Sequence, residues 1–151
     1  MPAVPLRGRA LLRSCHGPRS KHVENPTAEL ALVSGARAQS AVCLQCHEGG
    51  SRFGWKAGPH DASDVNCTSC HTVMTKQSDR GLLSKANQGD ICYACHAEIR
   101  AELNKMSRHP VREGRIDCSG CHNVHGSTNV KLLKAGTTID ESCTSCHEKP
   151  E

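Results

Sequence analysis

Cys118-Ser119-Gly120-Cys121-His122 is the stretch that decides the fold, because the same pattern recurs along the 151-residue sequence. The pattern is Cys-x-x-Cys-His, and its other copies are Cys43-Leu44-Gln45-Cys46-His47, Cys67-Thr68-Ser69-Cys70-His71, Cys92-Tyr93-Ala94-Cys95-His96 and Cys143-Thr144-Ser145-Cys146-His147. Two thiols on one turn can each add to a vinyl group at the edge of a porphyrin, and the histidine that follows can bind the iron. The five copies predict five covalently bound c-type haems.

This chemistry assigns a role to each residue of the motif. We expect thioether bonds from ten cysteines: Cys43, Cys46, Cys67, Cys70, Cys92, Cys95, Cys118, Cys121, Cys143 and Cys146. We expect the proximal iron ligands to be the histidines that end the motifs: His47, His71, His96, His122 and His147.

The aromatic content is too small for an ordinary core, since the chain has one Phe, one Trp and one Tyr. Five porphyrins could fill that role, with the polypeptide wrapped around them. We therefore expect a multihaem cytochrome c fold, mostly irregular with a few short α-helices, little or no β-structure and a core formed by haems.

The formal net charge of +4 says little about partners, because the propionates of five haems would outweigh it. Lysines and arginines are scattered rather than clustered, so we expect no binding to nucleic acid. No apolar run is long enough to span a bilayer, so we expect no transmembrane segment.

The motifs start at residues 43, 67, 92, 118 and 143, which indicates an internal repeat of about 25 residues. We expect residues 41–151 to form a single pentahaem domain of five such repeats. Residues 1–40 are expected to be an irregular N-terminal segment with a degenerate haem motif and a short helix at 26–38. A second helix is predicted at 97–106, after the third motif.

Five histidines remain for the second face of the irons: His16, His22, His60, His109 and His125. A spare histidine is often an exposed bystander, but with five irons to saturate we expect His60, His109 and His125 to be distal ligands. If His122 and His125 share a helical turn, their imidazoles face the same way, and His125 must serve a different haem. His60 and His109 precede motifs two and four by similar distances and look equivalent.

Two irregularities leave alternatives open. Met74 stands where comparison with the fourth motif predicts a histidine, and it is either a distal thioether ligand or a packing residue. Cys15-His16 resembles the end of a sixth motif with Leu12 in place of the first cysteine. It either binds a sixth haem through one thioether or is a damaged motif without haem, and we expect the latter.

The sequence resembles a known family over Cys15 to the C-terminus. The segments Ser107-Arg108-His109-Pro110-Val111-Arg112-Glu113-Gly114 and Cys118 to Ser127 are similar to periplasmic decahaem cytochromes of the DmsE/MtrA type, as is Cys15-His16-Gly17-Pro18 with Lys21-His22-Val23-Glu24. Such cytochromes have ten motifs where this chain has five, so it resembles half of one or a shorter relative. Pentahaem electron donors of periplasmic nitrite reductase are similar in scale.

The resemblance implies electron transfer in periplasmic or trans-outer-membrane respiration, in the periplasm or associated with the outer membrane. It implies His60, His109 and His125 as distal ligands, and His22 as well. The implied partners are a quinol-oxidising donor, an outer-membrane β-barrel with an outer-surface cytochrome, or a terminal reductase. Covalent haem attachment also requires export, yet no signal peptide is visible before Arg13, so the start lies upstream or the sequence is a fragment.

Three other interpretations compete with an electron carrier that is not an enzyme. A multihaem reductase of nitrite, hydroxylamine or a similar small molecule needs an open haem face, and the spare histidines nearly match the irons. Structural zinc sites do not require a histidine after every second cysteine. A disulfide-bonded domain does not explain those histidines either, and it leaves Cys15 over.

Overall fold

The computed structural model describes residues 13–18, 20–25, 35–136 and 138–147. In these ranges the chain is mostly irregular, with short helices and no strands, which confirms the expected fold class. The α-helices are α2 (Ser20–Glu24), α3 (Ala36–Leu44), α4 (Pro59–Ala62), α5 (Cys67–Cys70), α6 (Gln88–Cys92), α7 (Ala97–Glu102), α8 (Cys118–Cys121) and α9 (Ile139–Thr144). Two 3₁₀ turns, η1 (Gly50–Arg52) and η2 (Val130–Leu132), and a helical turn at 13–16 complete the set.

Local capping explains why such short helices form. Asn66 caps α5 by accepting a hydrogen bond from the Ser69 N–H at 2.9 Å, and the Ser69 side chain returns a bond to Asn66. Thr138 and Glu141 form the same reciprocal arrangement at the start of α9. These capping boxes satisfy backbone donors that a helix of one or two turns would otherwise leave free.

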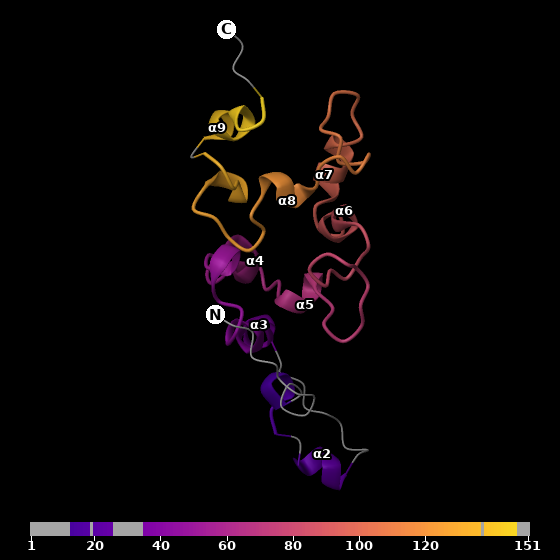
Figure 1. Cartoon of the computed structure of the whole chain (residues 1–151), viewed down its shortest axis with the longest axis vertical. Coiled ribbons are helices and arrows are strands. Elements are labelled where there is room, and N and C mark those ends of the chain that lie inside the picture. Colours follow the sequence, from indigo (N-terminus) through magenta and orange to yellow (C-terminus); the bar gives the residue numbers. More distant parts are fainter. Residues whose placement is uncertain (1–12, 19, 26–34, 137, 148–151) are drawn as a thin grey trace.

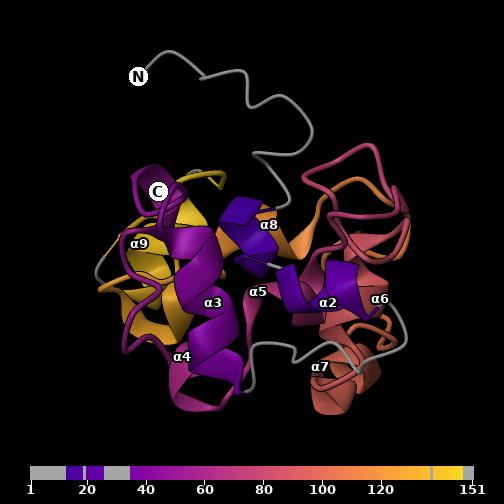
Figure 2. The ribbon, with the colours of Figure 1, turned by 90° about the horizontal axis from the view of Figure 1, so that it is seen from below.

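The molecule is elongated, with α2 and α9 towards opposite ends (Figure 1). Seen from below, α4 and α9 lie on one side, α6 and α7 on the other, and α5 and α8 between them (Figure 2). No helix in the described ranges has the length and apolar character needed to cross a membrane.

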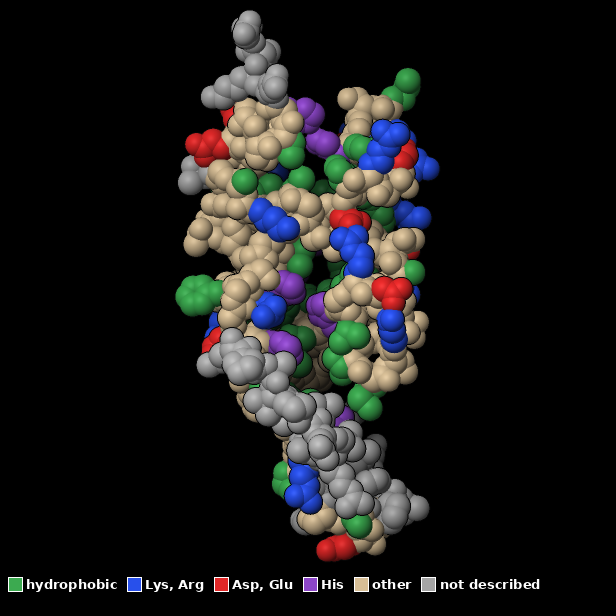
Figure 3. Space-filling view, viewed as in Figure 1, with side chains coloured by type: hydrophobic (Ala, Val, Ile, Leu, Met, Phe, Trp, Pro, Cys, Tyr) green, Lys and Arg blue, Asp and Glu red, His purple; other side chains and the backbone are tan. Residues whose placement is uncertain are grey.

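Trp55, 8% exposed, is the only buried hydrophobic residue in the part of the chain that the structure describes. Large apolar side chains such as Phe53, Met74 and Met106 are exposed instead. Histidine side chains gather along the furrow between the two sides of the molecule (Figure 3). The protein's own side chains therefore supply very little of a conventional core, as the low aromatic content predicts.

Two predicted helix boundaries differ from the structure. Of the helix expected at 26–38, residues 26–34 lie outside the description, and the described helix α3 continues beyond Ala38 to Leu44. The helix expected at 97–106 ends at Glu102. The N–H groups of Asn104 and Lys105 bond three residues back, to Ala101 and Glu102, so the last turn tightens and the helix stops.

The backbone groups the motifs in pairs. After α5, His71 forms an antiparallel bridge with Leu83, and after α8, His122 forms the same bridge with Leu133. The flanking backbone hydrogen bonds also correspond. After motif two, the N–H of residue 72 donates to the carbonyl of residue 82, and that of residue 84 to the carbonyl of residue 70. After motif four, the N–H of residue 123 donates to the carbonyl of residue 132, and that of residue 134 to the carbonyl of residue 121. Motifs two and four are thus structurally equivalent, in a unit of about 50 residues that holds two motifs.

Two glutamines join the units in equivalent ways. On α3, Gln39 Oε1 accepts a hydrogen bond from Asn66 Nδ2 at 2.7 Å, next to the second motif. On α6, Gln88 exchanges two hydrogen bonds with Ser119 of the fourth motif, at 2.8 and 3.0 Å. Each glutamine therefore holds the helix of one motif against the next motif along the chain.

Candidate haem-binding sites

Each of the five motifs folds into a single turn of the same kind. In each, the histidine N–H donates a hydrogen bond of 2.9–3.0 Å to the carbonyl oxygen of the first cysteine. In motifs two and four the cysteines begin and end α5 and α8, whereas in the other three the first cysteine lies in the last turn of α3, α6 or α9. This turn places two thiols and an imidazole together, as thioether attachment requires.

Backbone carbonyls orient two of the expected proximal imidazoles. His71 Nδ1 lies 2.6 Å from Gly81 O, and His122 Nδ1 lies 2.7 Å from Lys131 O. A carbonyl can only accept, so Nδ1 carries the proton and Nε2 keeps its lone pair. Nε2 of both residues is therefore available to a metal, with the ring direction fixed by the second hydrogen bond.

The structure brings three proximal histidines close to three expected distal ones. The ring centroids of His71 and His125 are 6.1 Å apart. The corresponding separations are 6.4 Å for His60 and His96, and 6.2 Å for His109 and His147. All three pairs join residues far apart in the sequence.

These separations fit an iron between the rings. A ligating nitrogen lies about 1.1 Å from the imidazole centroid and about 2.0 Å from a bound metal, so two imidazoles on opposite faces have centroids roughly 6.2 Å apart. Rings in direct stacking contact would be closer. The three imidazole pairs therefore have the spacing of axial ligands to haem iron.

Trp55 links two of these pairs. Its ring is 6.5 Å from that of His60 and 6.3 Å from that of His125. His60 Nδ1 lies 3.0 Å from Val124 O, so one expected distal ligand is bonded to the backbone next to the other. The indole Nε1 is buried and has no hydrogen-bond partner among the described residues. A haem propionate is the kind of acceptor that this donor fits.

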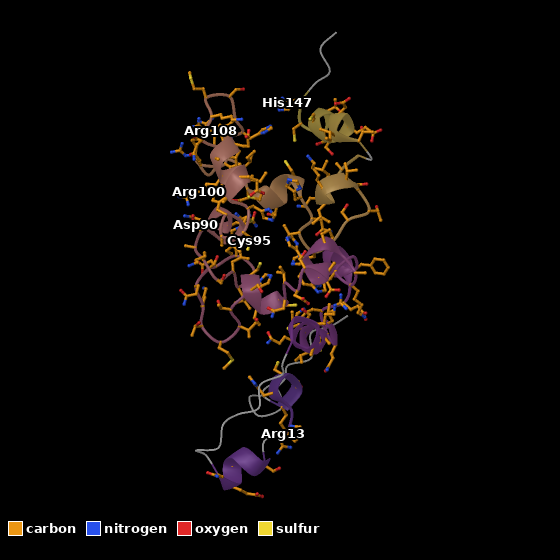
Figure 4. The ribbon with its side chains drawn as sticks, turned by 180° about the vertical axis from the view of Figure 1, so that it is seen from behind. Arg13, Asp90, Cys95, Arg100, Arg108 and His147 are labelled. Atoms are coloured by element: carbon orange, nitrogen blue, oxygen red, sulfur yellow. The ribbon has the colours of Figure 1, made fainter. Side chains whose placement is uncertain are left out.

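The attachment cysteines of consecutive motifs also lie close together. The Cys67 thiol of motif two helps to raise the pKa of Cys43 in motif one, and burial has the larger effect there. Burial and the Cys118 thiol raise the pKa of Cys92 to about 12. Cys70 of motif two has a raised pKa because of burial and the nearby Cys95 of motif three. Motifs one to four thus follow one another in space as in the sequence. Cys95 lies on the inner side of its half of the molecule (Figure 4).

His125 differs from the expectation in its local geometry. His122 has an extended backbone, with φ −105° and ψ 139°, so the premise that His122 and His125 share a helical turn is wrong. The bridge to Leu133 pulls the chain out of α8 at this residue. His125 is half-buried, and burial together with His71, Arg52 and His60 lowers its pKa. Its imidazole is therefore held neutral, the form that binds a metal.

Other expected ligands have no such partner in the described ranges. Among the described side chains, neither His47 nor His122 has a second imidazole at the separation of the three pairs. His16 and Met74 are exposed. The side chain of His22, on α2, lies outside the described residues.

The structure also bears on the interpretations of the cysteines as zinc ligands or as disulfides. In the described ranges, no group of three or more His, Cys, Asp or Glu side chains is placed to hold a metal ion. The eleven cysteines there are free thiols. Sequence reasoning missed Trp55 and the two glutamines, although the 49-residue spacing of Gln39 and Gln88 is a signal that it could have used.

Comparison with known proteins agrees with this geometry. Residues 60–101 and 109–151 match the family model described as Doubled CXXCH motif. The chain is 36% identical over 140 residues to Multiheme cytochrome MtrA of Shewanella baltica, an alignment covering 89% of this chain and 41% of that protein. It is 28% identical over 128 residues to High-molecular-weight cytochrome c of Nitratidesulfovibrio vulgaris, covering 84% and 20%. It is 26% identical over 119 residues to Cytochrome c-type protein NrfB of Haemophilus influenzae, covering 68% and 52%. The chain thus spans between a fifth and about half of the length of these relatives.

Proposed function

Because the chain belongs to the doubled CXXCH family and is a multihaem c-type cytochrome of the MtrA type, we propose that it carries electrons along a row of five haems. Each bound haem supplies an iron that gains and loses one electron. In this proposal the chain is an electron carrier and not an enzyme: its residues hold the irons at fixed spacing and close their faces to small molecules.

The observation that carries the proposal is the contact between attachment residues of consecutive motifs. The thiols of motifs one and two lie close enough for one to influence the pKa of the other, as do those of motifs three and four, and Cys95 of motif three influences the pKa of Cys70 in motif two. Electron transfer weakens steeply with distance, so an electron carrier needs its redox groups edge to edge. Attachment cysteines of consecutive motifs that lie close together would bring the edges of their two porphyrins close together.

The imidazole pairs support closed iron sites. We assign His125 as the distal ligand opposite His71, His60 as that opposite His96, and His109 as that opposite His147, from the ring separations of 6.1–6.4 Å. Two histidines leave no open position for a substrate and favour electron transfer. For the iron of His47, His22 stays the predicted distal ligand.

The location and partners follow from the chemistry of attachment. Thioether haem is formed in exported proteins, so we place the chain in the periplasm or in association with the outer membrane. Its partners are redox proteins: a quinol-oxidising donor on one side, and on the other an outer-membrane β-barrel with an outer-surface cytochrome, or a terminal reductase.

The intact mass of the denatured protein tests haem loading, after periplasmic expression with a c-type maturation system. We expect an increase of at least five haems, each about 0.6 kDa. A smaller increase, or zinc in place of iron, would contradict the proposal.

Electron transfer is tested by stopped-flow spectroscopy with a low-potential donor. We expect every haem to be reduced, and then reoxidised by a second multihaem cytochrome. Steady consumption of nitrite or hydroxylamine by the reduced protein would instead identify a reductase.

A further inference from the structure

The loops after motifs two and four have the same architecture, although the first is one residue longer. Both begin with a histidine whose Nδ1 bonds a carbonyl ten or nine residues later, at Gly81 or Lys131. Both close through a bridge between that histidine and a leucine, Leu83 or Leu133. Counting from the histidine in each loop, Met74 occupies the position of His125.

That position has a defined target. His125 follows motif four, and its ring lies 6.1 Å from the ring of His71 in motif two. A side chain in this place therefore reaches back to the motif two steps earlier. Applied to Met74, which follows motif two, the same relation points to Cys15-His16, two motifs before it.

The placement of Cys15 agrees with this relation. In the second unit, Cys92 has Cys118 and Cys70 as its neighbouring thiols. In the first unit, the equivalent Cys43 has Cys67 and Cys15. The Cys15 thiol thus acts electrostatically on Cys43 as the Cys70 thiol acts on Cys92, and residues 13–16 form a helical turn, as α5 does.

The sequence alone favours a damaged motif without haem at Cys15-His16. From these equivalences we propose instead that Cys15, His16 and Met74 form a sixth haem site, with a single thioether at Cys15, His16 as proximal ligand and the Met74 sulfur as distal ligand. This extends the proposed function and rests on haem loading of the complete motifs. Attachment needs no oxidant: the Cys15 sulfur bonds one carbon of a vinyl group, and the thiol proton goes to the other. The second vinyl group stays intact, because Leu12 replaces the first cysteine.

The ligand set gives this site a distinct property. A thioether opposite histidine raises the reduction potential of haem relative to two histidines. Cys15 precedes the first motif in the chain and its thiol influences Cys43, so the site extends the row at its N-terminal end. Electrons would collect there in preference to the bis-histidine sites.

The test combines intact mass with the near-infrared charge-transfer band that methionine-ligated ferric haem shows. The wild-type protein is expected to carry six haems and to show this band. Cys15→Ala should remove one haem and the band together. Met74→Ala should keep six haems and lose the band, and Met74→His should replace it with a bis-histidine spectrum at lower potential.

Met106→Ala is the matched control, because Met106 is an exposed methionine like Met74 and has no counterpart among the ligand positions. It should change neither mass nor band. Five haems in the wild-type protein, or a band that survives Met74→Ala, would overturn the sixth site and leave the proposed electron carrier intact. Fewer than five would instead contradict the proposed function itself.

Discussion

The orientations of the paired imidazoles predict different magnetic spectra for two of the haems. The ring planes of His71 and His125 differ by 14°, whereas those of His60 and His96 differ by 76°. Parallel imidazoles donate π-electron density to the same iron d orbital and separate it in energy from its neighbour. Perpendicular imidazoles donate to one orbital each and leave the two nearly equal.

The expected consequence is visible by electron paramagnetic resonance of the oxidised protein. The iron between His71 and His125 should give an ordinary rhombic low-spin spectrum, and that between His60 and His96 a strongly anisotropic one with a single low-field feature. His125→Ala should remove rhombic signal, and His60→Ala the anisotropic feature. Each variant opens one of the four irons to which two histidines are assigned, so about a quarter of the low-spin intensity from these irons should become high-spin.

The two variants are matched controls for each other, since both remove a half-buried distal imidazole next to Trp55. Added imidazole should restore the low-spin state in both, because the cavity left by the side chain admits it. If both variants remove the same spectral feature, or if neither produces high-spin haem, the assignment of these axial pairs is wrong.

Three further substitutions test the packing that positions the ligands, each by thermal unfolding of the haem-loaded protein. Gln88→Ala should cost about 1–2 kcal/mol, because it removes two hydrogen bonds to Ser119; no change would mean that this contact does not join the units. Trp55→Ala should cost about 3–5 kcal/mol through loss of the buried indole, whereas Trp55→Phe should lose much less, and equal losses would contradict a packing role. Gly126→Ala should cost about 1–3 kcal/mol, because φ is +126° and a Cβ would overlap backbone, while Gly120→Ala, with open space around it, should be nearly neutral. Similar effects of the two glycine substitutions would show that the loop is not constrained there.

The turn that each motif forms was predictable because it is local, whereas haem attachment at these turns stays a prediction. Cys118, Cys121 and His122 must share one turn to reach one porphyrin, and the Cys-x-x-Cys-His spacing meets that requirement. The hydrogen bond from the histidine N–H to the first cysteine, common to all five motifs, is the structural form of the same requirement. The low aromatic content likewise predicted that side chains alone would form almost no core.

The pairing of ligands was less accessible, because it depends on contacts across the sequence. The motifs are evenly spaced at 24–26 residues, yet two kinds of motif alternate along the chain. In one kind the first cysteine begins a short helix, and in the other it lies in the last turn of a helix. The expectation that His122 and His125 share a helical turn failed because the bridge to Leu133 forces an extended backbone at His122. Helix propensity does not predict that bridge, because the bridge is a tertiary contact.

The arrangement makes each bound haem a cross-link within the chain. An iron between His71 and His125 closes a loop of 54 residues, which corresponds to about 4 kcal/mol of chain entropy removed from the unfolded state. The pairs at residues 60 and 96, and at 109 and 147, close shorter loops, and both of these overlap the 71–125 loop. Overlapping loops couple neighbouring units, so loss of one haem should loosen the ligands of the next. On the proposed assignment, a chain with a single buried apolar side chain among its described residues would hold a fixed row of redox centres, because the centres themselves would supply the cross-links that a conventional core provides.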